Sequence, residues 1–307
     1  MATDRYGKGS ILYKILIVLL TAALVVSIIY PKTLWEREAK NQELCRNRMS
    51  NLYNAELQYQ STNARFSGEA TELLSFIKAD SRYAKRLDSL VVQPIKVAIQ
   101  KLDSVRQIQM RADTLIASLI SKGSSTNRLD SAVVDSIDRL EDQVIWDSRA
   151  VRRLLEAVRE RMLTFPNLPI STLDRGLEII ERKEYFFAME IVKRMVSEVF
   201  DLQQARVSSK DALANIASIT RHLNATLEDI AQVPMTLDSL YFCPTFHDSI
   251  KIALVDSGVF RFANIYCPID SADIRLAEKD FIKARIGALK IANHGRIEKN
   301  EKSWEQK

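Results

Sequence analysis

Three cysteines and three histidines are the residues of this chain with the most distinctive chemistry. Cys243 and Cys267 both precede proline and lie on either side of a predicted β-hairpin, which would bring their sulfurs together. In an exported domain such a pair favours a disulfide. Closing the loop between Cys243 and Cys267 would contribute about 3 kcal/mol to the stability of the fold. Cys45 is then left over, either as a small buried residue or as a link to another chain.

A metal site is an alternative for the same part of the chain. Cys243 and His247 have a spacing compatible with zinc, and Cys267 and His294 could complete four ligands. The sequence contains no Cys-x-x-Cys pair, however, and the two cysteines could also stay as free, buried thiols. A disulfide, a zinc site and free thiols therefore remain open as interpretations.

The sequence indicates no catalytic or nucleic-acid-binding site. His247 is followed by Asp248 and Ser249, but no Gly-x-Ser-x-Gly turn supports a nucleophile there. The net charge of +5 is spread along the chain without a run of five like charges, which disfavours a nucleic-acid arm. We expect no enzyme activity, no cofactor, no small-molecule substrate and no nucleic-acid partner.

An uncharged, apolar stretch over residues 15–30 is the strongest signal in the sequence. Together with residues 11–14 it provides about 20 residues, enough to span a bilayer as a helix. We predict a short tail over 1–10, a transmembrane helix over 11–31 and a kink at Pro31. A cleaved signal peptide and a buried core helix are the alternatives. The predicted anchor residues are Ile15, Leu16, Ile17, Val18, Leu19, Leu20, Leu24, Val25, Val26, Ile28 and Ile29.

The remainder of the chain is predicted to be mainly helical, since only 8 glycines and 7 prolines occur in 307 residues. Residues 32–93 form an amphipathic stem and a short helix in this interpretation. Residues 94–234 have apolar side chains at near-heptad spacing, which predicts an antiparallel helical bundle. The stem's apolar face is a possible contact with another chain through Cys45, Met49, Leu52 and Tyr59.

The composition changes after residue 234. Strand-forming residues alternate on both sides of Asp256-Ser257-Gly258, which predicts a β-hairpin. We expect a small α+β cap over 235–297 and a flexible tail over 298–307. The predicted fold class is thus mainly α, with a single N-terminal transmembrane helix, a long helical stem and bundle, and a small C-terminal α+β cap.

The first 80 residues contain several features in a characteristic order along the chain. Gly9 precedes the apolar helix, Pro31 lies within it, and an amphipathic stretch runs from Cys45 to Tyr59. Arg65-Phe66-Ser67-Gly68 and then Leu73-Leu74 follow. This order resembles the N-terminal part of type IV pilins and type II secretion pseudopilins, in which a glycine precedes the helix and a stem leads into a loop and a short helix.

The resemblance covers about a quarter of the chain and has two departures. Mature pilins begin with an aromatic residue and carry a glutamate five residues in, where this chain has Ser10 and Lys14. The resemblance implies a protein of the bacterial inner membrane with an exported C-terminal domain. The Cys-Pro pairs are similar to disulfide-closed hairpins near the end of some pilin-like proteins.

Lys and Arg residues flank both ends of the apolar stretch, so charge does not decide the orientation. We predict a single-pass structural or interaction protein, a scaffold of the bacterial cell envelope, whose partners are the lipid bilayer and a homo- or hetero-oligomer formed through the stem. Its C-terminal domain is expected to be periplasmic. The alternatives are a membrane-tethered sensor or ligand-binding helical bundle, and an envelope protein with a structural zinc in the C-terminal cap.

Overall fold

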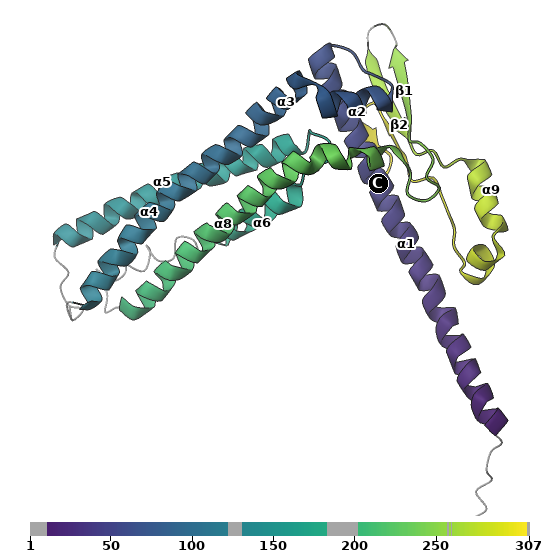
Figure 1. Cartoon of the computed structure of the whole chain (residues 1–307), viewed down its shortest axis with the longest axis horizontal. Helices are drawn as coiled ribbons and strands as arrows, with labels where there is room; N and C mark the ends of the chain where they lie inside the picture. Colours follow the sequence, from purple (N-terminus) through teal and green to yellow (C-terminus); the bar gives the residue numbers. More distant parts are fainter. Residues whose placement is uncertain (1–10, 122–130, 183–201, 257, 259, 306–307) are drawn as a thin grey trace, which may run out of the picture. The chain divides into compact units, whose positions relative to one another are not determined.

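The computed structural model describes residues 11–121, 131–182, 202–256, 258 and 260–305, and the chain is mainly helical (Figure 1). It divides into two compact units. Unit 1 comprises Met1–Glu56, Gly68–Ala70 and Ser239–Lys307, and unit 2 comprises Leu57–Ser67 and Thr71–Asp238. The predicted stem is therefore split, because its first part belongs with the C-terminal residues and its last part belongs with the bundle.

Helix α1 runs from Ile11 to Asn63 without interruption. Pro31 lies inside it, so the helix continues through the position where a kink was predicted. The side chains from Tyr13 to Ile29 are all exposed, and they include every predicted anchor residue. The chain thus has one long apolar N-terminal helix whose apolar part is not covered by other described elements.

Further along the same helix, one face is buried. Cys45 and Met49 are fully buried in unit 1, together with Leu52. Tyr59, at the end of the helix, is buried in unit 2. The face predicted to contact another chain is therefore filled by elements of this chain itself.

Unit 1 completes its fold with a four-stranded antiparallel sheet in the order β1-β2-β3-β4. The strands are β1 (Lys251–Asp256), β2 (Arg261–Tyr266), β3 (Arg296–Glu298) and β4 (Glu301–Lys302). β1 and β2 pair around the predicted hairpin, with Asp256 opposite Arg261. Helix α9 (Ser271–Lys279) and the π-helical turn η4 (Phe281–Ile286) separate β2 from β3. The predicted α+β cap is thus present.

The end of the chain is more ordered than its composition indicated. In place of the flexible tail predicted from residue 298, β4 pairs with β3 and places Ile297 opposite Lys302. The guanidinium carbon of Arg46 on α1 lies 5.7 Å from the centre of the Trp304 ring. The two strands are short, but their pairing and this cation–π contact hold residues 298–305 against unit 1.

Unit 2 is a bundle of long helices (Figure 1). Its elements are α2 (Ala70–Ala79), α3 (Ser81–Leu87), the π-helical turn η1 (Asp88–Val92), α4 (Gln93–Ser121), α5 (Ser131–Met162), α6 (Ile170–Glu181) and α8 (Leu202–Thr236). Helix α4 packs against both α5 and α8, and α6 packs against α8 and α5. The predicted helical hairpin is confirmed as α4 and α5, while its connecting turn lies outside the described residues.

The periodic apolar residues of the bundle form its core, as the near-heptad spacing predicts. In α4, Ile95, Ala98, Leu102 and Val105 are all fully buried. An aromatic row closes one end of unit 2, where Tyr59, Phe76, Tyr83 and Phe165 make successive edge-to-face contacts at 5.1, 5.2 and 5.9 Å between ring centroids. This row joins the end of α1 to α2, α3 and the turn after α5.

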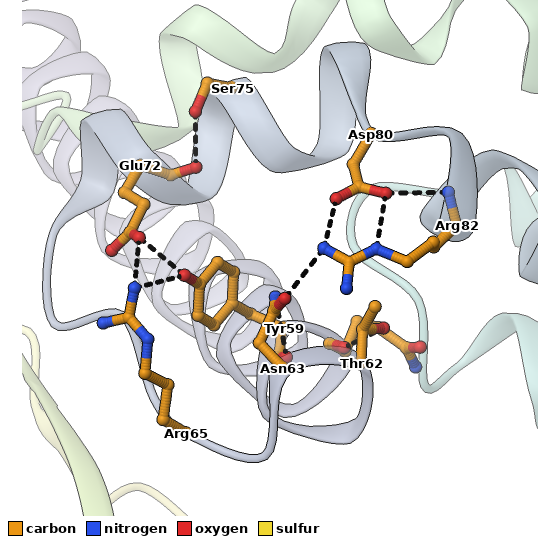
Figure 2. A network of polar contacts seen from close by, with 9 residues as sticks. Tyr59, Thr62, Asn63, Arg65, Glu72, Ser75, Asp80 and Arg82 are labelled. Atoms are coloured by element: carbon orange, nitrogen blue, oxygen red, sulfur yellow. Dashed lines mark hydrogen bonds and ion pairs between the residues drawn. The ribbon is translucent and has the colours of Figure 1, made fainter.

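A polar network lies beside the aromatic row (Figure 2). Glu72 on α2 accepts hydrogen bonds from the hydroxyl of Tyr59 at 2.5 Å and from Arg65 at 2.9 Å, as Figure 2 shows. The hydroxyl of Ser67 also donates to Glu72, at 2.5 Å. Hydrogen bonds from Ser67 and Tyr59, helped by the charge of Arg65, lower the pKa of Glu72 against the opposing effect of burial. The carboxylate therefore fastens the loop after α1 to helix α2.

We expect Glu72→Gln to lower the free energy of unfolding by about 1 kcal/mol at neutral pH, because the side chain is partly exposed and the charge-assisted bonds weaken. A lowered native pKa means that the carboxylate stabilises the fold above the ordinary glutamate pKa of about 4.3 and loses this effect as pH falls through the native value. The difference between the native protein and the variant should therefore shrink in acid. Urea denaturation at several pH values measures it.

The control is Glu228→Gln, which removes an exposed carboxylate from α8 in the same unit. This substitution should leave the free energy of unfolding within about 0.5 kcal/mol of the native value. A Glu72→Gln effect that stayed constant from neutral to strongly acidic pH would contradict the role assigned to the carboxylate.

Candidate metal centre

Three cysteines and one histidine converge in the interior of unit 1. Their potential ligand atoms all lie within 4.8 Å of one another, and all four side chains are buried. We call this group the thiol–histidine cluster, and its members are Cys45, Cys243, Cys267 and His294.

Helix α1 supplies the first thiol. Cys45 lies on the buried face of the helix, and its Sγ is 3.9 Å from the Sγ of Cys267, a residue 222 positions away in the sequence. The next residue also links α1 to the sheet, because Arg46 Nε donates a 2.9 Å hydrogen bond to the backbone carbonyl of His294. The part of α1 that enters unit 1 is thus fixed beside the cluster.

A tight turn supplies the second thiol. The backbone N–H of Cys243 donates to the carbonyl of Asp248, and the N–H of His247 donates back to the carbonyl of Cys243, each at 2.8 Å. A β-bridge between Phe242 and Ser249 closes the base of this turn. His247 adopts a φ of 61° and is exposed, so it lies outside the cluster.

The sheet supplies the third thiol and the imidazole. Cys267 follows the last residue of β2, and His294 precedes β3, so strand pairing brings the two residues together. The backbone N–H of Cys267 donates to the carbonyl of Gly295 at 3.2 Å. Asn293 adds side-chain hydrogen bonds to the carbonyls of Cys267 and Ile269, at 3.3 and 2.6 Å.

Gly295 is required by this geometry. Its φ of +125° is rarely adopted by other residues, and a Cβ at this position would come within 2.7 Å of the Trp304 ring. The backbone of His294 is thus fixed on both sides. Gly295 lies against Trp304, and Asn293 donates hydrogen bonds to the backbone carbonyls that follow β2.

The imidazole of His294 has a defined orientation. Its Nδ1 lies 3.6 Å from the Sγ of Cys243, and its Nε2 lies 3.1 Å from Oε1 of Glu38 on α1. The hydroxyl of Thr245 also donates to both oxygens of Glu38, at 3.1 and 3.3 Å. In the neutral imidazole, a proton on Nε2 would be held by this carboxylate, and the lone pair of Nδ1 would then face the Sγ of Cys243.

The cluster perturbs the protonation of its members. Hydrogen bonds from Cys267 and Cys45 lower the pKa of Cys243, whereas the interaction with Cys243 raises the pKa of Cys45. Burial lowers the pKa of His294, but interactions with Cys243, Cys267 and Glu38 outweigh burial and raise it to about 11. The cluster therefore favours a buried thiolate, which is the form of cysteine that binds metals.

The structure has all three cysteines as free thiols and does not contain the predicted Cys243–Cys267 disulfide. It also changes the predicted metal ligands, because Cys45 takes the position that the sequence assigned to His247. Cys243, Cys267 and His294 are brought together as that prediction required.

The sequence analysis did not assign Glu38 or Cys45 to the candidate metal site, although a signal for both was present. Glu38 and Cys45 are seven positions apart and so share one face of a helix, the same face that carries Met49 and Leu52. A carboxylate on the apolar face of a helix indicates that a polar partner is buried beside it. Nothing in the local spacing, however, indicated that the partner would come from the other end of the chain.

Comparison of the chain with protein-family models, with curated proteins and with solved structures gives no significant match.

Proposed function

We propose that this chain is a single-pass, membrane-anchored structural or interaction protein of the bacterial cell envelope. The observation that carries the proposal is the two-part character of helix α1. Its first part is apolar and uncharged over residues 15–30, with the side chains from Tyr13 to Ile29 exposed, and one face of its later part is buried within unit 1. An exposed apolar helix of this length is costly in water and stable in a bilayer.

Two alternatives to an anchor are less well supported. A core helix of a soluble protein would be covered by other elements, but the apolar window of α1 has no buried residue among the described part of the chain. A signal peptide is normally separable from the mature fold. Here the apolar part continues without a break into the segment that carries Glu38 and Cys45, which supports a retained anchor.

An interaction role is supported by the surface of unit 1. Leu254, Val255 and Phe260 belong to the β1–β2 hairpin and its turn, and they are 49%, 41% and 62% exposed. Val255 and Leu254 point to opposite faces of the strand, so this hairpin presents exposed apolar side chains on both faces, where they can contact another molecule. The likeness of the first 80 residues to pilins supports the inner membrane and a periplasmic location for both units.

Fractionation of cells that produce the full chain tests the anchor. We expect the chain to stay in the membrane pellet after washing with high salt and then at alkaline pH, because apolar insertion resists both treatments whereas charge-based attachment does not. A chain lacking residues 1–31 should be recovered from the aqueous fraction. Recovery of the native chain in the aqueous fraction would overturn the proposal.

A reporter fused after Lys307 tests the side of the membrane within the same experiment. Alkaline phosphatase is active only outside the cytoplasm, so activity is expected from this fusion. A cytoplasmic reporter at the same position serves as the matched control and should be inactive. The reverse pattern would place both units in the cytoplasm and remove the periplasmic part of the proposal.

A further inference from the structure

We propose that the thiol–histidine cluster binds one zinc ion in a closed, structural site, and that Glu38 is its positioning residue. This inference is independent of the membrane proposal, because it concerns side chains of unit 1 alone. It differs from the zinc site that the sequence indicated, since the fourth ligand is Cys45 on helix α1.

The distances between donors fit a tetrahedron around zinc. With zinc–sulfur bonds of about 2.3 Å and zinc–nitrogen bonds of about 2.05 Å, tetrahedral geometry requires about 3.8 Å between two sulfurs and about 3.6 Å between a sulfur and a nitrogen. The Cys45–Cys267 sulfurs are 3.9 Å apart, and Cys243 Sγ lies 3.6 Å from His294 Nδ1. These two distances match tetrahedral zinc, and all four donor atoms lie within 4.8 Å of one another, close enough to share one ion.

The donor set selects zinc and a structural role. Thiolates are soft ligands that favour zinc over magnesium or calcium, and three cysteines with one histidine form a common structural zinc site. A catalytic zinc keeps one position for water or substrate. Here four buried protein ligands would fill all tetrahedral positions, so we infer that the ion has no open position.

A disulfide accounts for less of the geometry. A sulfur–sulfur bond is about 2.05 Å long and joins only two cysteines, so the third thiol would stay buried and unused. In a disulfide that included Cys243, the Nδ1 of His294 would face a weak sulfur acceptor. A metal ion uses all three sulfurs and that nitrogen together.

Glu38 completes the arrangement from outside the ligand shell. Histidines that bind metals commonly donate the other ring N–H to a carboxylate, which fixes the tautomer and increases ligand basicity. Glu38 Oε1 lies 3.1 Å from His294 Nε2, and Thr245 holds the same carboxylate. Because Glu38 and Cys45 share one face of α1, this helix contributes both a ligand and the group that orients another.

The metal would fasten elements that are distant in the sequence. One ligand comes from α1, one from the turn after η3 (Leu237–Tyr241), one from the end of β2 and one from the residue before Gly295 and β3. A bound ion would join helix α1 to the sheet region of unit 1 by direct bonds. Such sites contribute their binding free energy to folding.

The test begins with the full chain, purified in detergent from whichever fraction holds it, under anaerobic conditions and without added metal. Elemental analysis should give about one zinc per chain, as expected for a single closed site. Replacement of zinc by cobalt(II) should then produce the thiolate-to-metal charge-transfer bands and intense visible bands of tetrahedral cobalt.

Two variants separate this cluster from the site that the sequence predicted. Cys45→Ser should reduce the zinc content to about a tenth or less and abolish the charge-transfer bands, since a ligand is lost. His247→Asn removes the exposed histidine and should retain full zinc content. The reverse result, with zinc lost from His247→Asn and kept in Cys45→Ser, would overturn the ligand assignment.

A third variant keeps the proposal testable if the ligand variants fail to fold. Glu38→Gln retains all four ligands and should weaken zinc binding about 10- to 100-fold in competition with a chelator, as loss of an outer carboxylate does elsewhere. Glu43→Gln, an exposed glutamate on the same helix, is the matched control and should bind zinc like the native chain. Equal zinc affinity in both variants would exclude a positioning role for Glu38.

Two results for the native chain would overturn the zinc site itself. One is an intact mass that shows a disulfide between any two of the three cysteines. The other is freshly purified protein that contains iron or no metal in place of zinc and that binds neither zinc nor cobalt(II) when either ion is added.

Discussion

The double variant Leu20→Arg/Leu24→Arg should be recovered in the aqueous fraction or be lost to degradation, whereas the native chain stays in membranes. Both leucines lie near the middle of the apolar stretch and are exposed on α1, at 61% each. An arginine at the centre of a transmembrane helix costs about 3 kcal/mol on the insertion scale, so two cost about 6 kcal/mol. This corresponds to about a ten-thousand-fold change in partitioning.

The control places the same substitution elsewhere on the same helix. Leu44 is 43% exposed but lies beyond the apolar stretch, so Leu44→Arg should leave the chain in the membrane pellet. Recovery is measured by immunoblotting of each fraction after alkaline washing. If the double variant remained in the washed pellet in the amount of the native chain, residues 11–31 would not be the membrane anchor.

Phe165→Ala should lower the free energy of unfolding by about 4 kcal/mol, because it deletes a large, fully buried side chain and leaves a cavity. Phe165 is 2% exposed and makes an edge-to-face contact with Tyr83 at 5.9 Å. It lies in the turn between α5 and α6 and ends the aromatic row of unit 2. The loss of packing should therefore affect the whole end of the bundle.

Trp146→Ala is the matched control, since it removes a larger aromatic ring from α5 of the same unit. Trp146 is 76% exposed, so its deletion should change stability by no more than about 0.5 kcal/mol. Denaturation followed by far-ultraviolet circular dichroism measures both variants, because most of the helical signal comes from unit 2. Similar denaturation midpoints for the two variants would show that the packing of Phe165 does not stabilise the core as predicted.

Local patterns in the sequence determined the long elements of this protein. The uncharged run over 15–30 predicted the apolar N-terminal helix, and the near-heptad spacing in 94–165 predicted the hairpin of α4 and α5. Alternating strand formers around Asp256 predicted the β1–β2 pair. These predictions hold because helix and strand periodicity depends on residues a few positions apart.

Short elements and backbone continuity were less predictable. β3 and β4 contain only three and two residues, and the residues from 298 onward were predicted to be a flexible tail. β3 pairs with β2, which begins 35 positions earlier in the sequence, and β4 pairs with β3. Pro31 was predicted to kink the helix, and α1 is helical on both sides of it.

The thiol–histidine cluster needed the tertiary structure. Sequence spacing selected Cys243, Cys267 and His294 as candidates and added His247, which follows Cys243 in the same short segment. The fold replaced His247 with Cys45, because the tight turn leaves His247 exposed and the buried face of α1 places Cys45 beside Cys267. Residue type and local spacing specify which side chains are able to bind a metal. Which of them meet is decided by the packing of a helix and a sheet from opposite ends of the chain.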